Sequence, residues 1–455
     1  MYIGIEKKLQ YLVNVDLHPD NTIDLITNID GFKPFKSSKV HIWPILIEIF
    51  HILGIYKPFT VAAYSGNSHP KDPYIFLKDF LTELNKLIRE GITILSKKFK
   101  VRIKFITADT PARSYMKCCM GHTSKKACER CTAIGESIDY VMTFLDFDAP
   151  KRTDEDFRSF KDAEYHHNPC PFLHIEFPLD LIALFVLDPM HLWYLVILKR
   201  ILDFWFLPGH KKCRQSNSMK MELDRRTKMT YKDIPSEFFR KMRSTINYGI
   251  YKAVESSFFL KYCGPVALKK ILDKKYYNHF LLLHYACRLL SEPNAERNTD
   301  EARACLRKFL DDVKDLYGPT FCTVSVHNLI HVCDDIDNTK CNLMQLSAFK
   351  FESYLSKIGR KLLAPTNLLA QYCNRMYEED VHKATVAILP LEIEIISENE
   401  NEITSLKYRQ YTLTAKHQNT LLLKNGKVVK INKIYKKNSK IFLRVQNYKK
   451  KDLVY

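Results

Sequence analysis

The sequence predicts a mixed α/β protein with a large helical region and a small β-rich segment near its C-terminus. Strand-like apolar runs fill the first 110 residues, helix-period apolar stripes dominate from about 181 to 345, and short alternating runs follow residue 402. The composition, 46% hydrophobic and 12% aromatic, is typical of a well-filled interior. A chain of 455 residues has room for two or three structural units.

The first part of the chain predicts a sheet with one early helix. Its first strand ends on Asp30 and Gly31, and its fourth ends at Asp109, where Pro111 cannot continue a ladder. Three strands, a helix and a fourth strand are the opening order of an RNase H-like fold, in which the first and fourth strands lie side by side. The predicted elements are strands over 22–32, 40–50, 53–64 and 101–109 and a helix over 73–90.

We expect this RNase H-like core to be interrupted by a large α-helical insertion. The core begins in residues 1–144, the insertion covers 145–345 with zinc-binding ends, and a catalytic helix within 346–394 returns to the sheet. Residues 395–455 are predicted to form an acidic linker and a small basic β domain, whose Asn425-Gly426 pair is a strong hairpin turn signal.

Positive charge is concentrated near the C-terminus of this sequence. Residues 405–455 contain 14 Lys and Arg against one acidic residue, so they supply +13 of the net charge of +19. This balance favours a polyanionic partner, either nucleic acid or a membrane surface, although a solubilising surface is the alternative. The apolar stretch 178–198 carries Asp180, Asp188 and His191, which predicts a core helix or a strand followed by a helix instead of a membrane span.

The cysteines indicate a reducing compartment. There are 13, an odd number at irregular spacing, and no secretory signal is recognisable in residues 1–12. We therefore expect an intracellular location with free thiols.

Three acidic residues are candidate ligands for catalytic metal ions. Asp30 and Asp109 follow two predicted strands, and Glu352 lies on the predicted returning helix. Phosphodiester chemistry with two Mg²⁺ or Mn²⁺ ions needs carboxylates from separate elements, which together hold and flank the ion pair. The alternative for each aspartate is that it only caps the turn that follows.

Four residues are candidate ligands for a structural Zn²⁺. Cys128 and Cys131 have the spacing of a zinc knuckle, and His327 and His331 lie one helical turn apart. Together they would form a closed Cys₂His₂ site, although a chance pairing is the alternative among this many cysteines and histidines.

Further side chains are candidate accessories of the acidic site. Asp188 precedes Pro189 as a helix N-cap would, and His191 is expected to face the acidic residues or a phosphate. Arg113 and His122, which follow Asp109 in the sequence, are either phosphate contacts or surface residues.

Ordered motifs across nearly the whole chain resemble the Tnp2-type transposases of the CACTA superfamily. The segments that carry the resemblance are NIDGFKPFKSS, ADTPARSYMKCCMGHTSKKACERC, LDPMHLWYLVILKRIL, CGPVALKKIL, VHNLIHVCDDI and LSAFKFESYL. The chain is also distantly similar to the catalytic core of the V(D)J recombinase and its Transib relatives, which place a Cys-x-x-Cys after the second acid and a His pair before the last.

The resemblance implies a DDE transposase that cuts double-stranded DNA and transfers a strand. The acid pattern of the family falls on Asp30, Asp109 and Glu352, and its Asp-x-x-His falls on Asp188 and His191. Nuclear localisation, two Mg²⁺ or Mn²⁺ ions, one Zn²⁺ and assembly into homodimers or larger complexes are what the resemblance implies; no membrane partner is expected.

Two other functions remain open at this level. No zinc finger or helix-turn-helix is recognisable ahead of the first predicted strand, so recognition of element ends is expected from the basic C-terminal segment or from a region outside these residues. The chain is alternatively a domesticated, catalytically silent module that binds DNA or protein, or a metal-dependent nuclease without strand transfer.

Overall fold

The computed structural model divides the chain into two compact units, Met1–Arg375 and Met376–Tyr455. We call them the core unit and the C-terminal unit. The structure describes residues 1–176, 179–232, 234, 242–388, 393–399, 402–408, 411–415, 420–422, 428–437 and 440–447. The segment 235–242, within the predicted helical region, lies almost entirely outside the described residues, and so does the turn at Asn425-Gly426.

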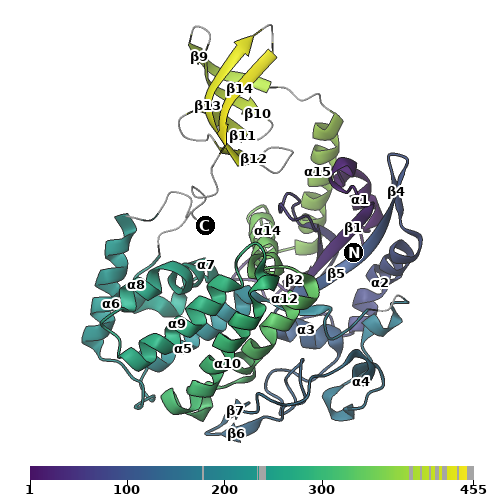
Figure 1. Ribbon diagram of the computed structural model, residues 1–455. Coiled ribbons are helices and arrows are strands. Elements are labelled where there is room, and N and C mark those ends of the chain that lie inside the picture. The colour runs from purple at the N-terminus through teal and green to yellow at the C-terminus, as the bar shows by residue number, and fades with distance from the viewer. Residues whose placement is uncertain are drawn as a thin grey trace. The chain divides into compact units, whose positions relative to one another are not determined.

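A curled, six-stranded mixed sheet forms the centre of the core unit (Figure 1). The strand order is β3-β2-β1-β5-β4, and β8 also pairs with β5, at the end of β5 opposite to the end that β4 pairs with. β1, β2 and β3 pair in antiparallel fashion, whereas β5 is parallel to both β1 and β8. The strands are β1 (Thr22–Ile29), β2 (His41–Ile49), β3 (Phe59–Gly66), β4 (Ile92–Ile94), β5 (Lys97–Ala108) and β8 (Phe185–Leu187).

Each face of the sheet contributes to its own hydrophobic core. One face packs against α1 (Glu6–Leu12) and α2 (Pro73–Glu90), where Asp72 caps α2 by accepting hydrogen bonds from two backbone N–H groups. The other face, which includes Ile26 and Phe105, packs against the helical region shown in teal and green in Figure 1. The sheet is therefore covered on both faces, as a sheet with parallel strands requires.

The helical region follows β8 in the sequence. Two of its long helices, α9 (Lys274–Leu289) and α10 (Thr299–Leu316), pack against each other. The other helices from this point are a π-helix, η4 (Met190–Ile197), then α5 (Leu198–Phe206), α6 (Asn217–Met229), η5 (Thr230–Lys232), η6 (Thr245–Ile250), α7 (Ala253–Phe258), η7 (Phe259–Cys263), α8 (Gly264–Leu268), η8 (Ala295–Arg297), η9 (Pro319–Phe321), α11 (Val324–His327), η10 (Asn328–His331), α12 (Val332–Thr339), α13 (Leu343–Leu346), α14 (Phe349–Gly359) and α15 (Leu368–Ile388).

Short elements connect β5 to β8 and complete the N-terminal part. They are α3 (Thr110–Lys117), β6 (Glu136–Ile138), β7 (Val141–Thr143), α4 (Asp154–Arg158), η2 (Ala163–Tyr165) and η3 (Pro171–His174), with η1 (Val15–Leu17) ahead of β1. Within the part of the chain that the structure describes, no helix is both long and apolar enough to cross a membrane.

After the end of α15, the C-terminal unit forms an all-β sheet, as the sequence predicts. Its strands are β9 (Ile393–Asn399), β10 (Glu402–Tyr408), β11 (Tyr411–Thr414), β12 (Thr420–Leu422), β13 (Val428–Lys437) and β14 (Lys440–Asn447). The predicted acidic linker is wrong for 395–399, because these residues belong to β9 and pair with β10. Ile395 and Leu406 supply the apolar side chains that favour this pairing.

The short strand β8 decides between the two readings of the apolar stretch at 178–198. Phe185–Leu187 extends the sheet, and the π-helix η4 starts only at Met190. The mostly helical region therefore begins after β8 and not at residue 145, because three fully buried apolar residues here satisfy their backbone groups by pairing with β5.

We predict that protonation of His279 destabilises the core unit at low pH. Burial lowers the pKa of this imidazole from 6.5 to about 4, and its ring nitrogens meet the Phe309 carbonyl at 2.8 Å and the Tyr317 hydroxyl at 3.2 Å, as a neutral ring would. The unfolded chain binds this proton near pH 6.5 and the folded chain only near pH 4, so stability falls as pH falls through this window.

Denaturant unfolding at about pH 7 and about pH 5 measures this effect. The His279→Gln protein should lose about 1–2 kcal/mol less stability on acidification than the unmodified protein. The matched variant His167→Gln changes an exposed histidine and should leave the pH dependence unchanged. Equal pH dependence in all three proteins would refute the prediction.

Candidate functional site

The ends of β1 and β5 bring the first two candidate acids together. The parallel register pairs Asn28 with Thr107, and the Asn28 side chain donates a 2.8 Å hydrogen bond to the Thr107 carbonyl. Asp30 and Asp109 each follow this pair by two residues, so they occupy equivalent positions beyond two neighbouring strands. Carboxyl ends of parallel strands are where α/β folds place their sites.

A third aspartate lies at the same edge of the sheet. The register of β5 and β8 pairs Ala108 with Leu187, so that Asp109 and Asp188 are the next residues on neighbouring parallel strands. Three adjacent strands thus end on aspartates, with Asp109 in the middle. The sequence identified all three residues, but only the strand register places them in a row.

Asp188 is a buried junction between β8, the π-helix η4 and α14. Its Oδ1 accepts hydrogen bonds from the N–H groups of Met190, at 3.0 Å, and Ala348, at 2.8 Å. Its Oδ2 accepts from the imidazole Nδ1 of His191 at 2.5 Å. The predicted role of Asp188 as a helix cap is confirmed, and the same carboxylate also orients His191 and holds the start of α14.

α14 is fixed against the sheet so that Glu352 reaches the acidic residues. Phe351 and Leu355 on this helix are buried in the core. Lys350 forms a 2.5 Å ion pair with Glu48, a buried residue of β2. Glu352 is thereby carried to the carboxyl edge of the sheet from far along the chain.

Asp30, His191 and Glu352 form one cluster. Each offers a ligand atom, and these atoms all lie within 4.8 Å of one another. Burial, together with the charges of Asp109 and Glu352, raises the pKa of the Asp30 carboxyl to about 8. The ionised form of Asp30 is therefore disfavoured by its surroundings, and a cation bound beside it would stabilise that form.

His191 supplies a positive charge to this cluster. Burial lowers the pKa of its imidazole, but the hydrogen bond to Asp188 and the charges of Asp188, Asp30 and Asp109 outweigh burial and raise it to about 9. The imidazolium form of His191 is thus favoured at neutral pH, beside a largely protonated Asp30 carboxyl.

Asp109 is at the same edge but has a second task. Its Oδ1 accepts a 2.8 Å hydrogen bond from the N–H of Ala112, so it caps α3 as the alternative interpretation of the sequence proposed. Its charge reaches Asp30, although Asp109 is not among the residues whose ligand atoms lie within 4.8 Å of one another. Asp30, Glu352 and His191 are therefore the closest set.

The predicted zinc ligands converge in the core unit. The Sγ atoms of Cys128 and Cys131 are 3.4 Å apart, and the Nε2 atoms of His327 and His331 are also 3.4 Å apart. The Sγ atom of Cys131 lies 3.2 Å from the Nε2 atom of His327. The Sγ atom of Cys128 lies 3.6 Å from the Nε2 atom of His331. Tetrahedral Zn²⁺ with thiolate and imidazole ligands has ligand–ligand edges of about 3.3–3.8 Å. All four residues are buried, so this Cys₂His₂ cluster can hold a structural metal such as zinc.

The chemistry of the cysteines agrees with metal binding and not with a disulfide. A sulfur–sulfur bond would require about 2.05 Å between Cys128 and Cys131. Burial raises the pKa of the Cys128 thiol, but hydrogen bonds with Cys131, His327 and His331 outweigh burial and hold it well below its usual range. The hydrogen bond with Cys128, together with burial, raises the pKa of the Cys131 thiol, so that without a cation the pair favours one thiolate and one thiol. A thiolate enclosed by imidazoles is the form that binds zinc.

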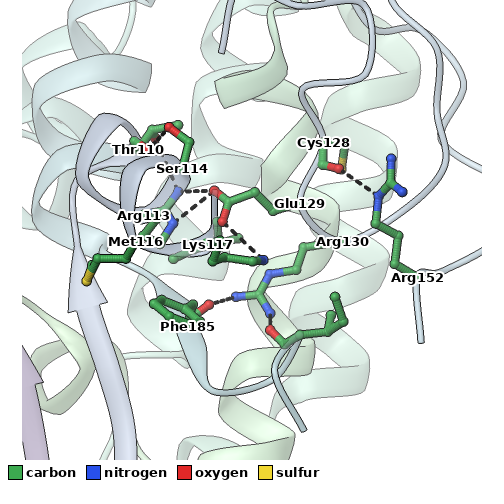
Figure 2. A network of polar contacts seen from close by, with 12 residues as sticks. Thr110, Arg113, Ser114, Met116, Lys117, Cys128, Glu129, Arg130, Arg152 and Phe185 are labelled. Atoms are coloured by element: carbon green, nitrogen blue, oxygen red, sulfur yellow. Dashed lines mark hydrogen bonds and ion pairs between the residues drawn. The ribbon is translucent and has the colours of Figure 1, made fainter. Parts of the chain in front are cut away.

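The two residues between the zinc-ligand cysteines anchor the cluster to the sheet (Figure 2). Glu129 is buried and pairs with Arg113 at 2.9 Å and with Lys117 at 3.5 Å, both on α3. Arg113 also donates to the Ala108 carbonyl at the end of β5. The knuckle is thus tied to the helix that Asp109 caps.

Arg130 makes the corresponding connection to β8. It forms a 2.9 Å ion pair with Asp335 on α12 and donates to the carbonyls of Ile182 and Phe185. Asp335 in turn accepts a 2.7 Å hydrogen bond from the N–H of Leu187, the last residue of β8. These buried charges are paired with charges of opposite sign, as charges in a protein interior must be.

Two predicted accessory residues differ in outcome. The contact of Arg113 with a phosphate is wrong for this structure, because the guanidinium is 3% exposed and engaged by Glu129. His122 is exposed in the loop after α3, and its role stays a prediction. Sequence reasoning missed Glu129, Arg130 and Asp335, although an acidic and a basic residue between two ligand cysteines were a visible signal.

A search of protein-family models finds no match to the chain, and a search of curated proteins finds none either. The fold and the site therefore define the class of this protein only broadly. It is a mixed α/β protein with a buried Cys₂His₂ cluster and an acidic cluster at the carboxyl edge of its sheet.

We predict about one Zn²⁺ per chain in the purified protein, measured by elemental analysis. Cys131→Ser should abolish this zinc and lower the melting temperature, because metal binding contributes to folding free energy. Cys305→Ser changes a half-buried cysteine outside the cluster, and this variant should keep both the zinc content and the melting temperature of the unmodified protein. A zinc content unaffected by Cys131→Ser would contradict the assignment.

We also predict that Glu129→Gln destabilises the protein by about 3–5 kcal/mol, because it leaves Arg113 and Lys117 as buried, uncompensated charges. Unfolding by denaturant measures the loss. Glu136→Gln makes the same change at an exposed position and should cost less than about 0.5 kcal/mol. Similar losses of unfolding free energy in the two variants would show that the buried ion pairs of Glu129 do not contribute to stability.

Proposed function

We propose that the chain is a metal-dependent polynucleotidyl transferase that cleaves DNA and joins the 3′-hydroxyl end to target DNA. The observation that carries this proposal is the cluster of Asp30, His191 and Glu352 at the carboxyl edge of the sheet, with Asp109 beside it. Carboxylates from separate elements are suited to hard divalent cations that also bind phosphate.

The sheet order supports an RNase H-like fold for this proposal. Three antiparallel strands, β3-β2-β1, are followed by the parallel neighbours β5 and β8. The first and fourth long strands are adjacent, as expected for that fold, and the helical region enters between β8 and α14. The proposal also draws on the resemblance of the sequence motifs to Tnp2-type CACTA transposases.

Under this proposal the side chains have distinct roles. Asp30, Asp109 and Glu352 hold the metal ions, and Asp188 keeps His191 in place beside them. Two Mg²⁺ or Mn²⁺ ions would supply activation of the nucleophile and stabilisation of the leaving oxygen. Basic residues of the chain would contact the DNA phosphates in a salt-dependent way. Nuclear location and assembly into dimers or larger complexes belong to the same proposal.

Substitution of the acidic residues tests the proposal. Asp30→Asn and Glu352→Gln should weaken Mn²⁺ binding measured by calorimetry by about tenfold or more, because each removes a ligand charge. Each should also lower nicking of DNA in Mg²⁺ or Mn²⁺ by about 10²-fold or more.

Asp139→Asn is the matched control, since it makes the same change at an exposed turn position with φ 47° that asparagine tolerates. Zinc content should be equal in all variants, which separates loss of the acidic site from misfolding. An Asp30→Asn protein that still nicks DNA would overturn the mechanism. DNA binding without cleavage in the unmodified protein would favour the catalytically silent alternative, and cleavage without joining would favour a nuclease.

A further inference from the structure

The outward face of β13 and β14 in the C-terminal unit carries an aromatic pair beside basic residues. Antiparallel register places Tyr435 opposite Phe442 and, two residues away, Lys433 opposite Arg444. The intervening pair of Ile434 and Leu443 points into the small apolar core. Because strand side chains alternate between faces, the aromatic and basic pairs share the opposite, outward face.

The aromatic pair is open to a ligand. Phe442 is 41% exposed, and its ring lies nearly parallel to that of Tyr435, with centroids 5.7 Å apart and 18° between the planes. The exposed Phe442 ring, stacked against the half-buried ring of Tyr435, offers an apolar surface on the neighbouring strand. Such a surface costs free energy in water unless another planar group covers it.

The strands of this unit differ in charge. β13 and β14 contain Lys and Arg and no acidic residue, whereas β9 contains Glu394 and Glu398 and no basic residue. A surface that served only solubility would not need the two signs on separate strands. Lys433 does form an ion pair with Glu402 at 3.2 Å, but both side chains are 45% exposed, and a pair of this kind contributes little.

We propose that this face of β13 and β14 binds single-stranded nucleic acid, with an unpaired base stacked on Phe442 and Tyr435 and the backbone phosphates held by Lys433 and Arg444. Stacking on aromatic side chains beside a positively charged surface is the physical basis of single-strand binding. In a duplex the base faces are already covered by neighbouring bases, so the aromatic pair selects for unpaired strands. The site is separate from the acidic cluster and does not rest on it.

Fluorescence anisotropy of the full chain with a labelled thymidine oligonucleotide and with a labelled duplex tests the proposal. Phe442→Ala should weaken single-strand binding by about tenfold and leave duplex binding within about twofold. Phe442→Trp keeps a stacking ring and should retain the affinity. Arg444→Gln should reduce the dependence of single-strand affinity on salt by about one phosphate contact, a slope change of about 0.7.

Ile396→Ala is the matched control, because it truncates a 52% exposed apolar residue on the acidic strand β9. It should change neither affinity. Circular dichroism should be the same for all variants, since Phe442 lies outside the apolar core of the unit. The proposal is overturned if Phe442→Ala behaves like Ile396→Ala, if the duplex is affected as strongly as the single strand, or if Phe442→Trp loses as much affinity as Phe442→Ala.

Discussion

The carboxylate of Asp188 is the interaction on which the acidic site depends. It accepts a hydrogen bond from the N–H of Ala348, 160 positions later in the chain, and another from the imidazole of His191. One buried side chain thus fixes the start of α14 and the orientation of the histidine. Because the group is desolvated, each hydrogen bond matters more than it would at the surface, and loss of one partner would leave a buried charge unpaired.

The Cys₂His₂ cluster and the buried ion pairs extend this constraint across the helical region. The cluster joins Cys128 and Cys131, which precede β8 in the sequence, to two histidines of the helical region that follows β8. Glu129 pairs with α3, and Arg130 bonds to Asp335 and to the backbone of β8. Buried ion pairs rarely add stability over apolar packing, but they are specific, because only one arrangement satisfies every charge. We infer that these ion pairs hold the ends of β5 and β8 in fixed positions relative to the helices that bear His191 and Glu352.

Local patterns were sufficient to predict most of the first sheet. The helix over 73–90 matches α2, and the strands that end before Asp30 and Asp109 were recognisable from apolar runs and turn residues. The short strand β8 could not be separated from a buried helix, because three apolar residues fit either structure until β5 provides hydrogen-bond partners. β9 was hidden for a related reason, since its acidic residues obscured an alternating strand that β10 pairs with.

The sequence by itself determined the chemistry that is available: carboxylates after strands, cysteines and histidines at ligand spacing, and a basic C-terminal segment. Those features depend on residue type and local spacing alone. Tertiary structure decided which groups meet, because strand register and helix docking act between residues far apart in the chain. It brought Glu352 to Asp30 and His191, closed the Cys₂His₂ cluster, and turned Arg113 away from solvent to neutralise Glu129.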